Sequence, residues 1–378
     1  MEKSFNMSAQ PLFTGAAAGY PYDAKLEMRF RCVSRFEEEY SLSEKDGDHL
    51  LIPRELCPMG AKDKRVPGIP VDIVSAVVPR TDEQTRVMSE GLAFLKAGQS
   101  GIIEAATGVG KTVIAADLIA KIGRKTLVVV HKDDLMQNWK SELVRHTNLK
   151  PSDIGTIQGD TFDVKGKKVV VGMIHSLAKK DRYPTFMKRE FGLVVFDEVH
   201  VCGAETFSKV AGLFYAKLRL GLSATPDRKD GKEILFKAHI GPVRIQSQLA
   251  NWTPKVTFVS SGWTCPSIPH SPGKCGHILS RMGKDQARNA KVVKLGAHCY
   301  RAGRTTVVFS DLAVEKHLGH LKRGLIGAGV PADEIAYYVG GMTAKQRDQA
   351  AGKKILLATY QMMSTGTNIP WLDCAILA

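Results

Sequence analysis

Apolar residues follow two different periods in residues 80–250. Short unbroken runs of Val, Ile and Leu alternate with longer stretches in which apolar residues recur every three or four positions. The first pattern is typical of strands buried on both faces of a parallel sheet, and the second is typical of amphipathic helices. The strand runs cover residues 101–105, 126–131, 168–173, 193–197 and 218–222, and the helical patterns cover 111–122 and 133–144. This alternation predicts a doubly wound α/β sheet with right-handed crossovers.

The same alternation starts again near residue 285. Helical patterns cover 285–299 and 312–325, and strand runs cover 305–309, 335–339, 355–358 and the end of the chain from 375. Residues 240–283, between the two blocks, are rich in Gly, Pro and Ser, which is typical of a connector. The predicted fold class is therefore α/β, with one lobe at 79–250, a connector at 251–284 and a second lobe at 285–378.

The first 78 residues differ from the rest in composition. They contain an acidic run at 37–39, a turn-like segment at 45–48 and several prolines. Short apolar runs at 50–52 and 71–74 predict strands. We expect a small accessory domain over residues 1–78, to which the sequence assigns no role.

Composition excludes several classes of protein. The chain has 378 residues, which suggests more than one core, and a hydrophobic share of 44%, which argues against disorder. No apolar run approaches the ~20 residues that span a bilayer, and residues 1–22 lack a signal-peptide pattern. The seven cysteines form no Cys-x-x-Cys pair, so neither a disulfide framework nor an ordinary zinc ribbon is indicated. We expect a soluble cytoplasmic protein (in the host cytoplasm if viral) without a membrane partner.

Basic residues outnumber acidic ones, for a net charge of +15. The first 80 residues hold 11 basic and 12 acidic residues, so the whole excess lies on the two predicted lobes. An excess of this kind indicates either a polyanionic partner such as nucleic acid or a plain solvated surface. Charge alone leaves both readings open.

A glycine-rich loop follows the first predicted strand and opens the first predicted helix. It consists of Ala106, Thr107, Gly108, Val109, Gly110, Lys111 and Thr112. Small residues let backbone N–H groups curl around phosphate oxygens, and the N-terminus of the following helix favours negative charge. In such a loop Lys111 reaches the β- and γ-phosphates and Thr112 ligates Mg²⁺. The sequence therefore predicts a nucleoside triphosphate site.

Two carboxylates end the apolar run at 193–197. Asp197 and Glu198 would lie at the carboxyl edge of the sheet, where ligands of open α/β sheets bind. We predict that Asp197 holds the Mg²⁺ shell and that Glu198 orients or deprotonates the attacking water. For His200 both a coupling role and a plain surface role stay open.

These residues resemble the superfamily 2 helicases and translocases. Residues 197–200, Asp-Glu-Val-His, look like the DEAH-type box of that family, and Ser223, Ala224 and Thr225 resemble its motif linking hydrolysis to nucleic-acid movement. The continuation through 229–231 is similar to the DNA-repair and phage recombination (UvsW-like) branch. The resemblance covers about residues 80–378 and implies tandem RecA-like P-loop NTPase lobes, with ATP and Mg²⁺ as cofactors.

Two further segments of the first lobe match family motifs. Gln84 resembles the adenine-reading residue, since an amide can both donate to and accept from adenine. Lys132 lies in the segment that resembles the first motif contacting a nucleic-acid strand. We interpret Trp139, which follows it, as a core residue rather than a base stacker.

Motifs of the second lobe also occur in the family's order. Gly340 lies in a segment that resembles a nucleic-acid-facing turn. Thr359 and Gly366 belong to a stretch that is similar to the motif touching both ATP and nucleic acid. Thr365 and Asn368 stand there in place of the Glu and Asp common in the family.

The family's next motif contains a Gln and paired Arg residues, and the chain ends at Ala378 before it. We therefore expect that the second lobe is incomplete and that the chain binds ATP but hydrolyses it poorly compared with a version carrying the full lobe, because such Arg side chains accelerate phosphoryl transfer by roughly 10³–10⁵. Separately, Cys265, His270, Cys275 and His277 lie close together in the connector. Zinc binding and a plain loop are both open for that group.

The function that we predict is an ATP-dependent DNA helicase or translocase, acting on single-stranded or branched duplex DNA. The alternatives are an ATP-binding nucleic-acid clamp with little hydrolysis, the motor part of a larger machine, and an RNA helicase. The sequence leaves the oligomeric state open.

Overall fold

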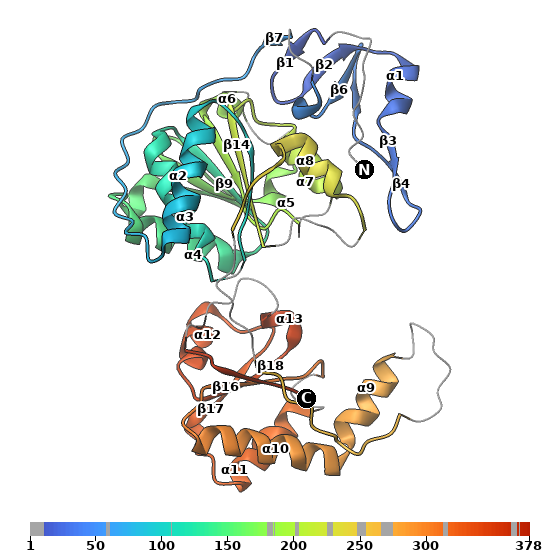
Figure 1. Cartoon of the computed structure of the whole chain (residues 1–378), viewed down its shortest axis with the longest axis vertical. Coiled ribbons are helices and arrows are strands. Elements are labelled where there is room, and N and C mark those ends of the chain that lie inside the picture. Colours follow the sequence, from blue (N-terminus) through green and yellow to red (C-terminus); the bar gives the residue numbers. More distant parts are fainter. Residues whose placement is uncertain are drawn as a thin grey trace. The chain divides into compact units, whose positions relative to one another are not determined.

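The chain forms two compact units, Met1–Trp252 and Thr253–Ala378, in a computed structural model (Figure 1). The structure describes residues 11–57, 61–106, 108–179, 184, 186–200, 204–224, 230–247, 255–265, 275–312, 317–363, 369 and 371–378. No helix in these ranges is long and apolar enough to cross a membrane.

The N-terminal part of the first unit is a small antiparallel-rich sheet. Its described strands follow the order β5-β6-β2-β1-β7, beside a two-stranded β3-β4 ribbon. The elements are β1 Phe13–Thr14, β2 Ala18–Pro21, α1 Ala24–Arg29, β3 Arg31–Val33, β4 Glu39–Ser41, β5 Glu44–Asp46, β6 His49–Ile52, the short 3₁₀ helix Arg54–Leu56, and β7 Lys62–Asp63. The strand predicted at 50–52 is confirmed within β6, and Gly47 at φ +57° makes the predicted turn before it.

The strand predicted at 71–74 is wrong. This segment belongs to no strand, and only the flanking Pro70 and Ser75 form isolated bridges, to Arg124 and Thr147. The N–H of Val71 donates to the carbonyl of Gly123, and the N–H of Val74 donates to the Asn148 side chain. These two backbone N–H groups therefore bond to loops of the first lobe instead of to a neighbouring strand, so no ladder of strand hydrogen bonds forms.

The first lobe is a doubly wound sheet, as predicted. Its described strands follow the order β11-β10-β12-β9-β13-β14-β8-β15, and every neighbouring pair is parallel except β10 with β11. The strands are β8 Gly101–Glu104, β9 Thr126–Val130, β10 Ile154–Gln158, β11 Thr161–Asp163, β12 Val169–Met173, β13 Leu193–Phe196, β14 Leu218–Ser223 and β15 Val243–Gln246. The helices are α2 Asp82–Lys96, α3 Lys111–Ile122, α4 Asp133–His146, α5 Ile174–Leu177, α6 Met187–Glu190, α7 Ala204–Ala211 and α8 Glu233–Ile240.

Successive residues of the central strands face two separate cores. Val128 of β9 packs in a cluster with α2, α3 and α4, whereas Val129 packs in a cluster with α5 to α8. The helices therefore cover both faces of the sheet (Figure 1). This arrangement explains why β9, Thr126–Val130, is apolar nearly throughout instead of alternating with polar residues.

The second unit contains a parallel sheet whose described strands follow the order β17-β18-β16-β19. The strands are β16 Thr306–Phe309, β17 Ile335–Tyr338, β18 Ile355–Ala358 and β19 Cys374–Leu377. The helices are α9 Cys275–Lys284, α10 Gln286–Arg301, α11 Gly319–Gly327, α12 Ala344–Ala351 and α13 Tyr360–Met363. All four predicted strands are confirmed, while α9 is a helix within the predicted connector.

Candidate active site

The glycine-rich loop joins β8 to α3 at the carboxyl edge of the first-lobe sheet. The N–H of Ala105 donates to the carbonyl of Ser223, which fixes the start of the loop to the end of β14. Gly110 is the N-cap of α3 at φ +89°, and among the described residues no side chain caps this helix. The first N–H groups of α3 are therefore left for an external acceptor, which is the property of an anion-binding helix N-terminus.

Two glycines shape the loop in different ways. Gly108 has φ +92°, and a Cβ added there would meet nothing within 4 Å. A Cβ added at Gly110 would lie 2.8 Å from Nε2 of Gln84. Gly108 thus borders open space, as a phosphate cradle requires, and Gly110 allows close packing against α2. Thr107 lies outside the described residues.

Gln84 connects the loop to the segment before α2. Its Oε1 accepts from the N–H of Arg80 at 2.7 Å, and its Nε2 donates to the carbonyl of Val109 at 2.7 Å. Thr81 caps α2 by accepting from the N–H of Gln84. The amide therefore uses both of its functions on the protein, and its contact with adenine stays a prediction.

Lys111 and Glu198 come together across the edge of the sheet. Nζ of Lys111 lies 3.2 Å from Oε1 of Glu198 and donates to the carbonyl of Ala105 at 3.1 Å. The two side chains are only 9% and 18% exposed. A cation for phosphate oxygens and a carboxylate for water thus lie side by side, although 86 residues separate them in the sequence.

Asp197 is a buried carboxylate held by an indole. It is 4% exposed, and its Oδ2 accepts from Nε1–H of Trp139 at 2.8 Å. Burial raises the pKa of Asp197 to about 6, and the Trp139 hydrogen bond opposes this shift while the charge of Glu198 adds to it. A divalent cation at this carboxylate would favour its charged form.

Glu198 has a strained backbone. Its φ of +47° is in the left-handed region, which is uncommon for a residue with a Cβ. The turn that follows returns the chain to the sheet, where the N–H of Val199 donates to the carbonyl of Leu222. The buried Oε2 of Glu198 has no hydrogen-bond partner among the described residues. An acceptor of this kind is suited to a water molecule.

His200 joins the acidic segment to the end of β14. Its Nδ1 lies 2.8 Å from Oγ of Ser223 and 3.5 Å from Oε2 of Glu198. The structure thus brings two predicted motifs into contact. Thr225 lies outside the described residues.

Lys132 is the N-cap residue of α4. The neighbouring His131 was not predicted from the sequence; neither of its ring nitrogens has a hydrogen-bond partner among the described residues. Burial, aided by the charge of Lys132, lowers the pKa of His131 to about 4. The ring is therefore neutral at physiological pH.

Two of the predicted residues of the second unit, Gly340 and Thr359, follow the carboxyl ends of strands in their own sheet. Gly340 follows β17, and Thr359 follows β18 and donates its N–H to the carbonyl of Tyr338 at 3.4 Å. Gly366 lies outside the described residues. Of the four connector residues for which zinc binding and a plain loop were both open, His270 also lies outside the described residues, and the described part of the chain contains no group of three or more potential metal ligands.

The residues present fit a Mg²⁺–nucleotide complex. The uncapped helix, the open space beside Gly108 and the Glu198 oxygen that accepts no hydrogen bond from the described residues are the features that such a ligand would use. The hydroxyl of Thr112, on the first turn of α3, and the carboxylate of Asp197 offer the hard oxygen ligands that Mg²⁺ prefers.

Comparisons with known proteins identify the family of the chain. The model of the family described as "Type III restriction enzyme, res subunit" matches residues 78–228. The probable helicase D10 of Escherichia phage T5 is 31% identical over 324 residues, covering 83% of this chain and 67% of that protein. The chain therefore belongs to the superfamily 2 helicases, the family that this similarity and the RecA-like lobes define.

Other relatives are longer than this chain. A putative ATP-dependent RNA helicase, L396 of Acanthamoeba polyphaga mimivirus, is 27% identical over 78% of this chain and 57% of its own length. The DNA 3'-5' helicase XPB of Mycobacterium tuberculosis is 33% identical over 45% of this chain and 30% of its own length. The chain thus spans about half or less of these two relatives.

A solved structure supports the fold. The Saccharomyces cerevisiae Dbp5 structure, in a complex with Gle1 and IP6, has a TM-score of 0.53 at 15% identity. It covers 78% of this chain and 76% of that chain. This similarity confirms the tandem α/β fold, while the UvsW-like branch and the truncation stay predictions.

Proposed function

We propose that the chain is an ATP-driven DNA translocase or helicase that couples hydrolysis in the first lobe to movement on DNA. The carrying observation is the 3.2 Å approach of Lys111 Nζ to Glu198 Oε1, beside an uncapped helix N-terminus. A phosphate-binding cation and a carboxylate facing the same open loop are the arrangement that phosphoryl transfer to water needs. The XPB relative, named as a DNA helicase, supports DNA as the partner.

Each residue has a distinct role in this proposal. Backbone N–H groups at the start of α3 bind phosphate oxygens, and Lys111 moves from Glu198 toward them. Glu198, once free of Lys111, orients the attacking water and accepts its proton. Mg²⁺, held by Thr112 and Asp197, would neutralise charge on the phosphates.

Coupling to nucleic acid would run through the hydrogen bond between His200 and Ser223. This bond joins the acidic segment to the loop after β14, so a shift of Glu198 is transmitted to that loop. Lys132, Thr225, Gly340 and Thr359 are the proposed nucleic-acid and coupling residues, and Gln84 and Gly366 the proposed nucleotide contacts. Contacts to phosphates predict binding that depends on salt more than on base sequence.

RNA is a second candidate partner. It is favoured by the similarity to L396, which is named as an RNA helicase. A nucleic-acid clamp with little hydrolysis is the other alternative, and it differs from a motor by the absence of turnover rather than of ATP binding.

One set of ATPase assays tests these proposals. Phosphate release is measured without nucleic acid and with single-stranded DNA, duplex DNA, branched DNA or RNA. We expect the largest stimulation by DNA, and stimulation only by RNA would overturn the choice of partner. ATP binding without turnover in every arm would favour the clamp.

Lys111→Ala is the matching variant, and Lys96→Ala is its control because Lys96 is exposed at the end of α2. Lys111→Ala should reduce turnover at least 100-fold, since positioned charges at phosphates contribute several kcal/mol to the transition state. Lys96→Ala should keep wild-type turnover. Retained hydrolysis in Lys111→Ala would contradict the assigned site.

A further inference from the structure

Trp139 makes a hydrogen bond in the first lobe that the roles proposed above do not explain. It lies on α4, a helix whose buried residues are Leu135, Met136, Trp139 and Leu143. This spacing is that of an ordinary core-facing stripe, and Trp139 is 0% exposed. Its indole nevertheless ends at a carboxylate, because Nε1 donates to Oδ2 of Asp197 at 2.8 Å.

The hydrogen bond between Trp139 and Asp197 satisfies both buried polar groups. An indole N–H can only donate, and when it is buried it must find an acceptor. Asp197 carries a buried carboxylate, whose charged form is costly without donors. Among the described residues, the indole is the one side-chain group that donates a hydrogen bond to this carboxylate, and the backbone N–H of Glu198 donates to it as well.

The same bond restricts the orientation of the carboxylate. Asp197 is anchored through its N–H, which donates to the carbonyl of Val129 at 3.0 Å. With the backbone fixed on one side and Oδ2 fixed by an immobile indole on the other, rotation of the side chain is limited. The second oxygen, Oδ1, is then held in one direction.

We propose that Trp139 is a positioning residue that holds Asp197 through Oδ2 and so presents Oδ1 to the divalent cation accompanying ATP. This inference rests on the proposed function. It assigns to α4 a part in metal binding, although α4 contributes no metal ligand itself. Residues that orient metal ligands typically change metal affinity by 10–100-fold when they are replaced.

The test separates hydrogen bonding from packing. Trp139→Phe removes the N–H and part of the ring, whereas replacement of Trp139 by β-(3-benzothienyl)alanine keeps the ring size and removes only the N–H. Trp371→Phe is the matched control, because its Nε1 donates to the carbonyl of Ala351 in the second unit. Thermal unfolding checks that each variant is folded.

The primary readout is binding rather than activity. A fluorescent N-methylanthraniloyl ATP analogue is titrated with Mg²⁺ against each variant, and Mn²⁺ affinity is measured by electron paramagnetic resonance. Both Trp139 variants should require about tenfold more Mg²⁺ for half-maximal binding, with unchanged nucleotide binding in EDTA. Trp371→Phe should match the wild type.

Each outcome has a distinct meaning. If the wild type shows no Mg²⁺-dependent nucleotide binding, the proposed function fails. If the wild type binds but the benzothienyl variant keeps the wild-type Mg²⁺ and Mn²⁺ dependence, the role of Trp139 fails while the function stands. An Asp197→Asn background sharpens this test, because Trp139→Phe should then have little further effect on metal affinity.

Discussion

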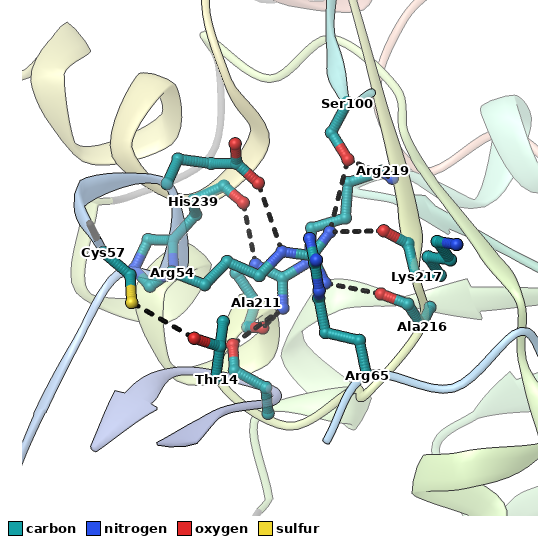
Figure 2. Close-up of polar contacts among 12 residues, drawn as sticks. Thr14, Arg54, Cys57, Arg65, Ser100, Ala211, Ala216, Lys217, Arg219 and His239 are labelled. Atoms are coloured by element: carbon teal, nitrogen blue, oxygen red, sulfur yellow. Dashed lines mark hydrogen bonds and ion pairs between the residues drawn. The ribbon is translucent and has the colours of Figure 1, made fainter. Parts of the chain in front are cut away.

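Strand β14 places polar groups at both of its ends, and the two ends are built differently. At the carboxyl end, Ser223 contacts His200 beside Asp197 and Glu198. At the amino end, Arg219 is 0% exposed and has no carboxylate partner among the described residues. Figure 2 shows that its guanidinium instead meets backbone carbonyls from several segments.

Arg219 connects the N-terminal sheet to the first lobe. Its Nη atoms donate to the carbonyls of Ala16, Ala211, Phe214 and His239, at 2.6 to 3.1 Å. The carbonyl of Ala16 belongs to the turn between β1 and β2, so the guanidinium bridges two parts of the unit. Burial lowers the pKa of Arg219 well below its ordinary value, and the charge of Arg54 adds to this shift.

Arg54 reinforces the same junction from the accessory side. It is 3% exposed, donates to the carbonyls of Ala216 and Lys217, and lies near Oγ of Ser100 at 3.3 Å (Figure 2). Burial lowers the pKa of Arg54 to about 10, while Glu55, at 3.3 Å, opposes the shift. Two buried cations thus close the junction through backbone acceptors.

We interpret the amino end of β14 as structural and its carboxyl end as the candidate site of chemistry. At the amino end Arg54 and Arg219 are buried with lowered pKa values, and their Nη atoms donate to backbone carbonyls, although Nε of Arg219 has no hydrogen-bond partner among the described residues. At the carboxyl end Asp197 has a raised pKa, Glu198 has a left-handed φ, and Oε2 of Glu198 has no hydrogen-bond partner among the described residues. Shifted pKa values occur at both ends, so it is the left-handed φ of Glu198, beside the open space at Gly108, that distinguishes the carboxyl end as the candidate ligand site.

Arg219→Met gives the largest predicted effect on stability. The substitution keeps an apolar stem of similar length and leaves four carbonyls without their donor. We expect the free energy of unfolding of the first unit to fall by about 3–5 kcal/mol, because four buried unpaired acceptors, at roughly 1–3 kcal/mol each, outweigh the desolvation cost that is recovered when the buried cation is removed. Urea denaturation followed by hydrogen exchange of peptides from residues 11–21 and 218–224 measures this loss.

Arg244→Met is the control for Arg219→Met. Arg244 lies on β15, which β8 separates from β14, and it is exposed, although its Nε donates to the carbonyl of Ser100. Arg244→Met should therefore change the free energy of unfolding far less than Arg219→Met does. An Arg219→Met protein as stable as the wild type would show that the buried cation does not support the junction.

Asp197→Asn should raise the free energy of unfolding, whereas Arg219→Met should lower it. Because the folded pKa of Asp197, about 6, lies above the ordinary value of 3.8, ionisation destabilises the folded chain as the pH rises from 3.8 to 6. Above pH 6 this destabilisation amounts to at most about 3 kcal/mol. The neutral variant should therefore be more stable by about 1–3 kcal/mol at pH 7.5 and equal to the wild type near pH 4.

Unfolding of Asp197→Asn is measured in EDTA without nucleotide, so that no cation offsets the charge. The variant should also lose ATP hydrolysis, which would separate stability from activity at this site. Lower stability than the wild type at pH 7.5 would mean that the charged carboxylate is part of the scaffold, as Arg219 is.

Much of the fold could be predicted because its signals are local. Continuous apolar strands and the glycine-rich loop each carry their pattern within about ten residues. The β10 and β15 strands were missed because β10 mixes polar residues and Gly into its run and β15 is an exposed edge. Helix α9 was missed because Pro and Gly residues surround it.

The contacts that complete the site and the junction could not be predicted. Trp139 and Asp197 are 58 residues apart, and nothing in either segment names the other as its partner. Arg219 stands inside an otherwise apolar strand, and its acceptors are backbone atoms, which leave no trace in side-chain chemistry. Partners this far apart in the sequence are set by how the strands and helices are arranged in the fold, not by the residues next to them in the chain.

Arg86→Met sharpens the contrast between covered and exposed cations with the smallest expected effect. Arg86 on α2 is 39% exposed and pairs with two carboxylates, Glu83 at 2.8 Å and Glu90 at 2.9 Å. Despite these ideal partners, the same Arg-to-Met change should cost less than about 1 kcal/mol, because water replaces the lost contacts. The loss should shrink further in 1 M NaCl, where charges are screened within roughly 3 Å. Urea denaturation at low and high salt measures this loss of stability. A loss as large as that of Arg219→Met would mean that ion pairing, rather than burial against carbonyls, decides how much an arginine adds to the stability of this unit.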